Sequence, residues 1–159
     1  MTISVGDRIP ELTLKVMGEK GPENIATTDI FKGKKVVMFA VPGAFTPGCS
    51  VTHLPGYVIN ADKIKAKGVD TIVCVSVNDA FVMGAWGKES NADEILMLAD
   101  GNAELAKALG LTMDGSGFGL GLRSRRYAMI VEDGVVKHLA VEPEGGITVS
   151  GAEEILKHL

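Results

Sequence analysis

The sequence is poor in cysteine, in basic charge and in long apolar runs, and each shortage excludes a class of protein. It has two cysteines and no CxxC pair, so we expect neither a disulfide framework, nor a zinc ribbon, nor a redox-active dithiol. The formal net charge is -4, which does not supply the basic face that binding of nucleic acid requires. The longest apolar run, residues 36–41, is too short to cross a bilayer. We therefore expect no nucleic acid and no membrane among the partners.

The composition is otherwise that of an ordinary globular domain. Hydrophobic residues make up 46% of the chain and charged residues 23%, which excludes a disordered segment. A length of 159 residues suffices to bury a core, and we expect one domain over residues 1–159. The first ten residues show no basic patch followed by an apolar stretch, so we expect a cytoplasmic location with both cysteines reduced.

The potential metal ligands are scattered along the chain. They are Cys49, Cys74, His53, His138 and His158. A metal site would require this unrelated set to converge, and its spacing matches no metal motif. We expect no metal.

Strand patterns alternate with helix patterns, which predicts an α/β fold with a central mixed sheet flanked by helices. Residues 35–41 and 71–77 are continuous apolar runs and predict two buried, neighbouring, parallel strands. Residues 54–67 predict the helix between them. Further elements are expected at 78–88 (helix), 95–98 (strand), 103–109 (helix), 127–131 and 135–141 (strands around a tight Asp133-Gly134 turn).

Three local expectations are more specific. The helix that ends near Lys88 is expected to be capped by Asn78 or Asp79 and to bury Phe81, Val82, Ala85 and Trp86. The last helix is expected to begin at Ser150, with Glu153 completing a reciprocal capping box. Residues 112–124 are rich in glycine but lack the spacing of a nucleotide site, so they are expected to form a loop.

The segment Thr46-Pro47-Gly48-Cys49 is typical of a helix start. Thr46 suits the N-cap, and Pro47 suits the first helical position, where no amide donor is needed. Cys49 is then the third helical residue, among backbone N–H groups that lack helical partners and carry the positive end of the helix dipole. Cysteines at such sites have pKa values of roughly 3.5 to 7.5, against about 8.5 for a free cysteine. This position favours a thiolate.

Two interpretations of Cys49 compete. Most free cysteines are small buried hydrophobes. Here Pro42, Thr46 and Pro47 make the turn rigid. The turn also follows the C-terminal end of the preceding strand, and open α/β sheets place their active sites at the C-terminal ends of strands. These features favour a reactive nucleophile. For Cys74, in the middle of a predicted strand, packing in the core is the better interpretation.

Other side chains are candidates for tuning the thiol. His53 lies four residues after Cys49 and can share its helical face, although such a histidine more often caps or packs. Alternation along the strand before the hairpin puts Arg123 and Arg125 on one face and Arg126 on the other. A guanidinium aimed at the thiolate would hold it ionised and bind a polar substrate, but alternation does not decide which arginine does so.

Four motifs resemble one family, the peroxiredoxins, in the plant type II and mammalian fifth subgroup. They are P-G-A-F-T-P-G-C (42–49), S-V-T-H-L-P-G-Y (50–57), C-V-S-V-N-D-A-F-V-M (74–83) and R-S-R-R-Y-A (123–128). The resemblance implies a thioredoxin-like fold. It also implies that Cys49 is the peroxidatic cysteine, which attacks hydrogen peroxide or an alkyl hydroperoxide and becomes a sulfenic acid.

The resemblance implies roles for the neighbours of Cys49 as well. Pro42 would shield the thiolate, Thr46 would hydrogen-bond peroxide and sulfur, and Arg126 would stabilise both. The amides near Gly48 and Cys49 would add fixed donors along the line of displacement. No metal or organic cofactor is implied.

Regeneration is where the sequence departs from part of the family. Some members carry a second cysteine at the position of Val149, and this chain does not. We therefore expect a one-cysteine cycle, with glutathione and glutaredoxin, or thioredoxin, as reductant. The subgroup also implies a homodimer, for which the apolar Ala44 and Phe45 beside the site are candidate contacts.

A different class of function uses the same thiolate. A redox sensor or binding module of thioredoxin fold would pass its oxidation to a protein partner and turn over little peroxide. Steady-state peroxide consumption separates the two. A thiol transferase is the weakest alternative, because such enzymes commonly use a CxxC pair.

Overall fold

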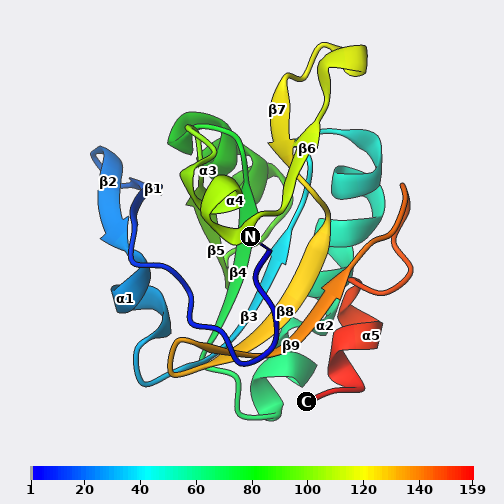
Figure 1. Cartoon of the computed structure of the whole chain (residues 1–159). Coiled ribbons are helices and arrows are strands. Elements are labelled where there is room, and N and C mark those ends of the chain that lie inside the picture. Colours follow the sequence, from blue (N-terminus) through cyan, green and yellow to red (C-terminus); the bar gives the residue numbers. More distant parts are fainter. Residues whose placement is uncertain (1) are drawn as a thin grey trace.

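A computed structural model describes residues 2–159 (Figure 1). Its centre is a seven-stranded sheet in the order β2-β1-β5-β4-β3-β8-β9. The strands are β1 (Thr13–Gly18), β2 (Gly21–Ala26), β3 (Lys35–Ala40), β4 (Thr71–Ser76), β5 (Ile95–Ala99), β8 (Tyr127–Glu132) and β9 (Val135–Val141). The helices are α1 (Thr27–Phe31), α2 (Leu54–Ala66), α3 (Ala80–Glu89), α4 (Glu104–Leu109) and α5 (Ala152–Leu156).

The sheet is mixed, as the sequence predicts. β3 pairs in parallel with β4, and β4 in parallel with β5, whereas β8 pairs antiparallel with β3. Because both faces of the sheet are covered, nearly every side chain of the central strands is buried, and their sequences are continuous apolar runs. Residues 36–41 are all 0% exposed. The prediction of two neighbouring parallel strands is confirmed.

Two apolar cores lie on the two faces of the sheet. One includes side chains of α2, α3 and α5, such as Tyr57, Trp86 and Ile155, and it also contains Cys49 and Cys74. The other includes side chains of α1 and α4. The two cysteines therefore share one side of the sheet.

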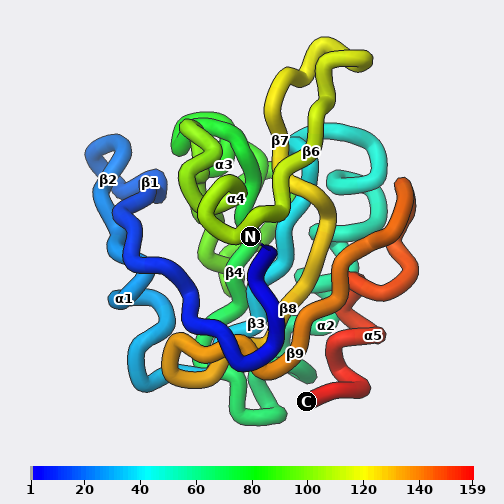
Figure 2. Tube along the Cα trace, viewed as in Figure 1, coloured from blue at the N-terminus to red at the C-terminus, as the bar shows by residue number. Residues whose placement is uncertain are grey.

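Several elements were not foreseen. The sequence predicts nothing specific for β1, β2 and α1, whose burial is only partial. Residues 112–124, expected to be a loop, contain the short strands β6 (Thr112–Asp114) and β7 (Leu122–Ser124), which pair antiparallel. Figure 2 shows this arm extending beyond the body of the molecule.

The predicted inner face of α3 is wrong. Phe81 is 64% exposed and Ala85 is also exposed, while Trp86 is buried as expected. The reason lies in two glycines: a Cβ on Gly84 would lie 2.7 Å from Cβ of Met17, and one on Gly87 would lie 2.7 Å from Cγ of Met97. The helix therefore packs closely against β1 and β5 through Gly84 and Gly87, and a pattern of hydrophobic residues does not mark glycines as an inner face.

The predicted start of the last helix is also wrong. α5 begins at Ala152 with Gly151 at the N-cap, and no side chain caps it. Ser150 lies before the helix, and its hydroxyl donates to Glu142 instead. Two other predictions are confirmed: the helix expected over 103–109 is α4, which ends at Gly110 (φ 71°), and Asp133 and Gly134 form the β8–β9 turn with φ 47° and 78°. Among the described residues, no helix has both the length and the apolarity to span a membrane.

Candidate active site

The candidate site begins where β3 ends. The chain turns through residues 41–46, and the helix starts at Pro47 as predicted, with the amide of Ser50 donating to the carbonyl of Thr46 (2.9 Å). Asn78 holds the turn in place, because its Oδ1 accepts from the amide of Ala44 (3.0 Å) and from the hydroxyl of Ser76 (2.6 Å). The turn is thus fixed to the C-terminal end of β4.

Phe45 has an unusual backbone in this turn. Its φ is 63°, a left-handed conformation that is unfavourable for a bulky residue. The Phe45 ring lies 6.4 Å from the ring of Trp86, centroid to centroid, and is 53% exposed. Trp86 in turn donates from Nε1 to Oγ of Ser50 (2.9 Å). Backbone strain of this kind gathers at functional sites.

Cys49 lies in the first turns of the helix and is 0% exposed. Residues Cys49–His53 form a π-helical turn, in which the amide of Leu54 reaches back to the carbonyl of Cys49. Such turns inside α-helices occur frequently at functional sites. Both Cys49 and His53 are buried.

Arg126 contacts the sulfur directly. Its Nη2 donates to Sγ of Cys49 at 3.2 Å. A Cβ on Gly48 would lie 3.3 Å from Nη2, so the absence of a side chain at residue 48 lets the guanidinium approach. Cys49 therefore has the positive charge of Arg126 beside it as well as the amides of the first turn, the surroundings in which a cysteine can act as a nucleophile.

The two other arginines lie elsewhere. Arg123 donates to the carbonyl of Leu120 (2.9 Å) and to that of Pro42 (3.4 Å), so it ties the β6–β7 arm to the Pro42 turn. Arg125 donates to the backbone carbonyl of Glu142 (3.1 Å). Of the three arginines considered, Arg126 alone bonds the sulfur within the described residues.

Thr46 and Pro42 border the site. The Thr46 hydroxyl donates to the carbonyl of Gly43 (2.6 Å), so it closes the turn and, among the described residues, makes no side-chain bond to the helix amides. Pro42 and Arg126 line a groove of about 340 Å³, together with Met113, Arg125 and Pro143.

His53 contacts Arg126 and makes no hydrogen bond to the sulfur. Nη1 of Arg126 lies 2.8 Å from Nδ1 of His53, and Nε2 of His53 lies 3.0 Å from the carbonyl of Ser150. Burial is the main cause that lowers the pKa of His53, with Arg126 adding to it, and brings it from 6.5 to about 4. The imidazole is neutral at neutral pH, so Nδ1 can accept from the guanidinium.

Cys74 is a buried thiol of a different kind. It is 0% exposed in the middle of β4, opposite Phe39 of β3, and neither cysteine is in a disulfide. Burial raises the pKa of Cys74 well above its usual value, and Cys49 raises it further. Cys74 is therefore a poor nucleophile in the folded chain.

Within residues 2–159, no group of three or more His, Cys, Asp or Glu side chains is arranged to hold a metal. His138 and His158 stack on each other, with ring centroids 3.9 Å apart, whereas His53 and Cys49 belong to the π-helical turn.

Sequence reasoning missed some residues around the site. Asn78 follows a predicted strand end, where polar side chains gather, and this signal was available. Glu142 is 4% exposed and accepts hydrogen bonds from residues 148–150. No local pattern marks it, because its bonds go to a loop with no periodicity.

Comparisons with known proteins identify the family of the chain. The profile of the Redoxin family matches residues 4–156. Peroxiredoxin-2E-2, chloroplastic, of Oryza sativa subsp. japonica is 54% identical, over 99% of this chain and 73% of the relative. Peroxiredoxin-2B of Arabidopsis thaliana is 46% identical, over 99% and 98%. The crystal structure of reduced Prx3 from Vibrio vulnificus in complex with H2O2 has a TM-score of 0.95 and 57% identity, over 99% of both chains.

Proposed function

The chain belongs to the redoxin family and, within it, to the peroxiredoxins, so it is a thiol-dependent peroxidase, and we propose that Cys49 is the sulfur that reacts. The observation that carries this proposal is the 3.2 Å contact between Nη2 of Arg126 and Sγ of Cys49, in the first turns of a helix. The Vibrio vulnificus relative is described with H2O2 bound, which supports hydrogen peroxide as a substrate here.

The reaction is a two-electron displacement at oxygen. The Cys49 thiolate attacks one peroxide oxygen, the S–O bond forms, and the O–O bond breaks. The leaving oxygen departs as hydroxide or alkoxide and takes a proton from water, and the sulfur is left as a sulfenic acid. Two electrons pass from sulfur to the peroxide, so no metal or organic cofactor is required in the proposal.

The neighbours of Cys49 have proposed roles in this step. Negative charge spreads over the sulfur and both oxygens, and donors that are already fixed lower the barrier without rearranging. Arg126 and the amides of Gly48 and Cys49 are the proposed donors. The Thr46 hydroxyl, 2.6 Å from the carbonyl of Gly43, is proposed to rotate toward the peroxide.

The groove beside Pro42 and Arg126 suggests how larger substrates bind. Its volume of about 340 Å³ is sufficient for the organic part of an alkyl hydroperoxide, and the O–O bond would lie near Arg126, which lines the groove and contacts Sγ of Cys49. Pro42, which also lines the groove, would shield the sulfur from water. We propose both hydrogen peroxide and alkyl hydroperoxides as substrates.

Regeneration is proposed to use an external thiol. A thiol attacks the sulfenic acid, releases water and leaves a mixed disulfide, and a second thiol then frees Cys49. Cys74 is a poor partner because it is buried in β4 with a raised pKa, and residue 149 is valine. Glutathione with glutaredoxin, or thioredoxin, is the proposed reductant.

Assembly and compartment are proposals too. Phe45 and Phe81 are 53% and 64% exposed, and apolar exposure of this kind supports a homodimer that packs beside the site. The cytoplasmic location stays a prediction, and two of the relatives in rice and Arabidopsis are described as chloroplastic.

The test is peroxide turnover by the wild type, Cys49→Ser and Cys74→Ser, each with glutathione plus glutaredoxin and with thioredoxin. We expect many turnovers by the wild type and by Cys74→Ser, and none by Cys49→Ser. If the wild type stopped after about one equivalent of peroxide with every reductant, a redox sensor would replace the peroxidase. If folded Cys74→Ser were inactive, the one-cysteine cycle would be wrong.

A further inference from the structure

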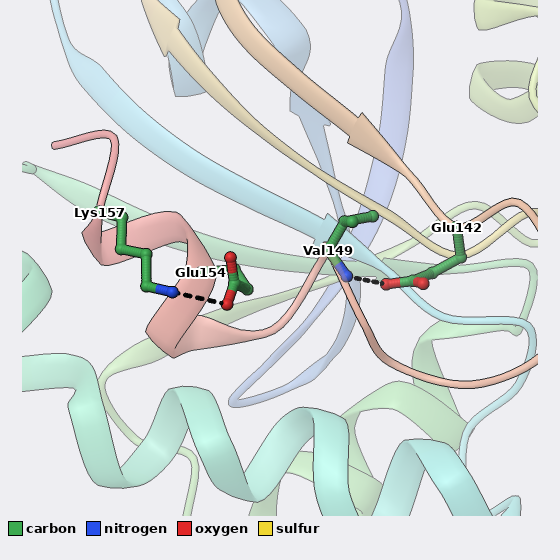
Figure 3. Close-up of polar contacts among 4 residues, drawn as sticks. All are labelled: Glu142, Val149, Glu154 and Lys157. Atoms are coloured by element: carbon green, nitrogen blue, oxygen red, sulfur yellow. Dashed lines mark hydrogen bonds and ion pairs between the residues drawn. The ribbon is translucent and has the colours of Figure 1, made fainter.

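Glu142 lies just after β9, and its carboxylate accepts hydrogen bonds from the loop that precedes α5. Oε2 accepts from the amides of Thr148 (2.9 Å), Val149 (2.8 Å) and Ser150 (2.8 Å). Figure 3 shows the bond from Val149. The hydroxyls of Ser150 (2.7 Å to Oε2) and Thr148 (2.6 Å to Oε1) complete the set. One buried carboxylate therefore fixes three consecutive residues.

This carboxylate is an anion held by neutral donors. No lysine or arginine in residues 2–159 forms a salt bridge with it. Burial acts to raise the pKa of Glu142, but the hydrogen bonds from Thr148, Ser150 and Val149 outweigh it and lower the pKa from 4.5 to about 2. Consecutive amides that converge on one anion form a stable nest.

The loop that Glu142 fixes presents the carbonyl of Ser150 to the interior. That oxygen accepts from the hydroxyl of Tyr57 (2.8 Å) and faces Nε2 of His53 (3.0 Å). Because a carbonyl only accepts, the single proton of the neutral imidazole lies on Nε2. Nδ1 is then left as an acceptor, and Nη1 of Arg126 donates to it.

The backbone of Glu142 also holds the backbone of Arg126. Its amide donates to the carbonyl of Arg126 (3.0 Å), continuing the β8–β9 pairing. Arg126 is therefore fixed at its backbone through Glu142 and at its guanidinium through His53. An arginine side chain is long and has many rotamers, so its direction toward Cys49 depends on such fixed contacts.

From these contacts we propose that Glu142 is a positioning residue for the peroxidase reaction: it holds Ser150, Ser150 holds the tautomer of His53, and His53 aims the guanidinium of Arg126 at Cys49. The proposal rests on the proposed function, because it assumes that Cys49 reacts with peroxide. It extends that function to a residue that touches neither the sulfur nor the substrate.

The test uses Glu142→Gln, which keeps the shape but replaces an accepting oxygen with an amide donor. The matched control is Glu154→Gln, whose carboxylate lies in the same region but, among residues 2–159, bonds only Lys157 on the surface (3.0 Å; Figure 3). The readout is the rate of reaction with hydrogen peroxide, followed by stopped-flow fluorescence of Trp86, the single tryptophan, which bonds the residue next to Cys49.

We expect the rate constant to fall about tenfold in Glu142→Gln, because the guanidinium is still present but less well aimed, and to stay unchanged in Glu154→Gln. The nitrogen NMR spectrum of His53 should lose the single Nε2–H form, a change that a general loss of stability would not cause. If Glu142→Gln does not fold, Thr148→Val removes only the bond to Oε1 and should give a smaller fall of the same kind.

A mutant cycle with Arg126→Gln decides whether Glu142 acts through the guanidinium. In the Arg126→Gln background, Glu142→Gln should produce no further loss. A full additional tenfold loss there, or a wild-type rate in folded Glu142→Gln, would overturn the proposal. A wild type that fails to consume peroxide would instead overturn the proposed function.

Discussion

At the scale of single residues, the chain separates two cysteines by their surroundings. Both are 0% exposed and lie on the same side of the sheet, yet Cys49 has Arg126 at 3.2 Å and the first-turn amides around it, and Cys74 has strand neighbours. Burial raises the pKa of the Cys74 thiol and keeps it protonated. The two cysteines therefore differ in the hydrogen-bond donors nearest to their sulfur atoms and not in how deeply they are buried.

Gly48→Ala tests the space that Arg126 occupies. Residue 48 has helical dihedrals (φ -63°, ψ -36°), so alanine fits the backbone and is expected to stabilise the helix by up to about 1 kcal/mol. The new Cβ would lie 3.3 Å from Nη2 and push the guanidinium from the sulfur. We expect peroxide reactivity to fall about tenfold while the melting temperature does not fall.

Gly56→Ala is the control for this substitution. It lies in α2, and a Cβ there meets nothing within 4 Å, so it should change stability alone. Equal activity in the wild type and Gly48→Ala, measured by stopped-flow, would show that the guanidinium does not need the room that the glycine leaves.

At the scale of elements, the sequence predicts the helix starts and turns that particular residue types mark. It does not predict the features that depend on packing between elements. The helix start at Pro47 and the turn at Asp133-Gly134 follow from residue types with fixed conformational preferences, and both predictions are confirmed. The inner face of α3 depends on Gly84 and Gly87, which carry no hydrophobic signal, so Phe81 was wrongly placed in the core.

The residues of the candidate site also fall into those that the sequence predicts and those that depend on tertiary structure. Cys49 follows from its place at a helix start, and Arg126 from the resemblance, whereas Glu142 bonds a loop whose position is set by tertiary structure. The expected capping box at Ser150 failed for this reason: the Ser150 hydroxyl and amide are both taken by Glu142.

Asp79→Ala tests the capping of α3. The Asp79 side chain accepts from the amide of Val82 (2.8 Å), and its loss should lower the free energy of unfolding by about 1 kcal/mol. Asp79→Asn keeps an acceptor and should cost less. Urea unfolding measures both, and an alanine variant as stable as the wild type would show that water caps this helix equally well.

At the scale of the whole molecule, two buried groups make the fold sensitive to acid. The folded pKa of His53 is about 4 against 6.5, and that of Glu142 about 2 against 4.5. Both folded values are lowered, so the unfolded chain binds protons first, and stability is lost as pH falls. The loss from His53 spans about pH 6.5 to 4, and that from Glu142 about pH 4.5 to 2, each amounting to roughly 3 kcal/mol at most.

Urea unfolding of the wild type at a series of pH values measures this loss. We expect the free energy of unfolding to be highest above about pH 6.5 and to fall toward pH 4. Glu142→Gln should start lower and lack the decline that belongs to the carboxylate. A free energy that stays constant from neutral pH to pH 4 would contradict the buried, neutral state of His53.

The central claim is that the amides of the first helical turn and the guanidinium of Arg126 keep the sulfur of Cys49 ionised. The most direct measurement is the ultraviolet absorbance of the thiolate at neutral pH in the wild type, Cys49→Ser and Arg126→Gln. We predict about one thiolate per chain in the wild type above the Cys49→Ser baseline, and less in Arg126→Gln. Identical absorbance in the wild type and Cys49→Ser would contradict the account.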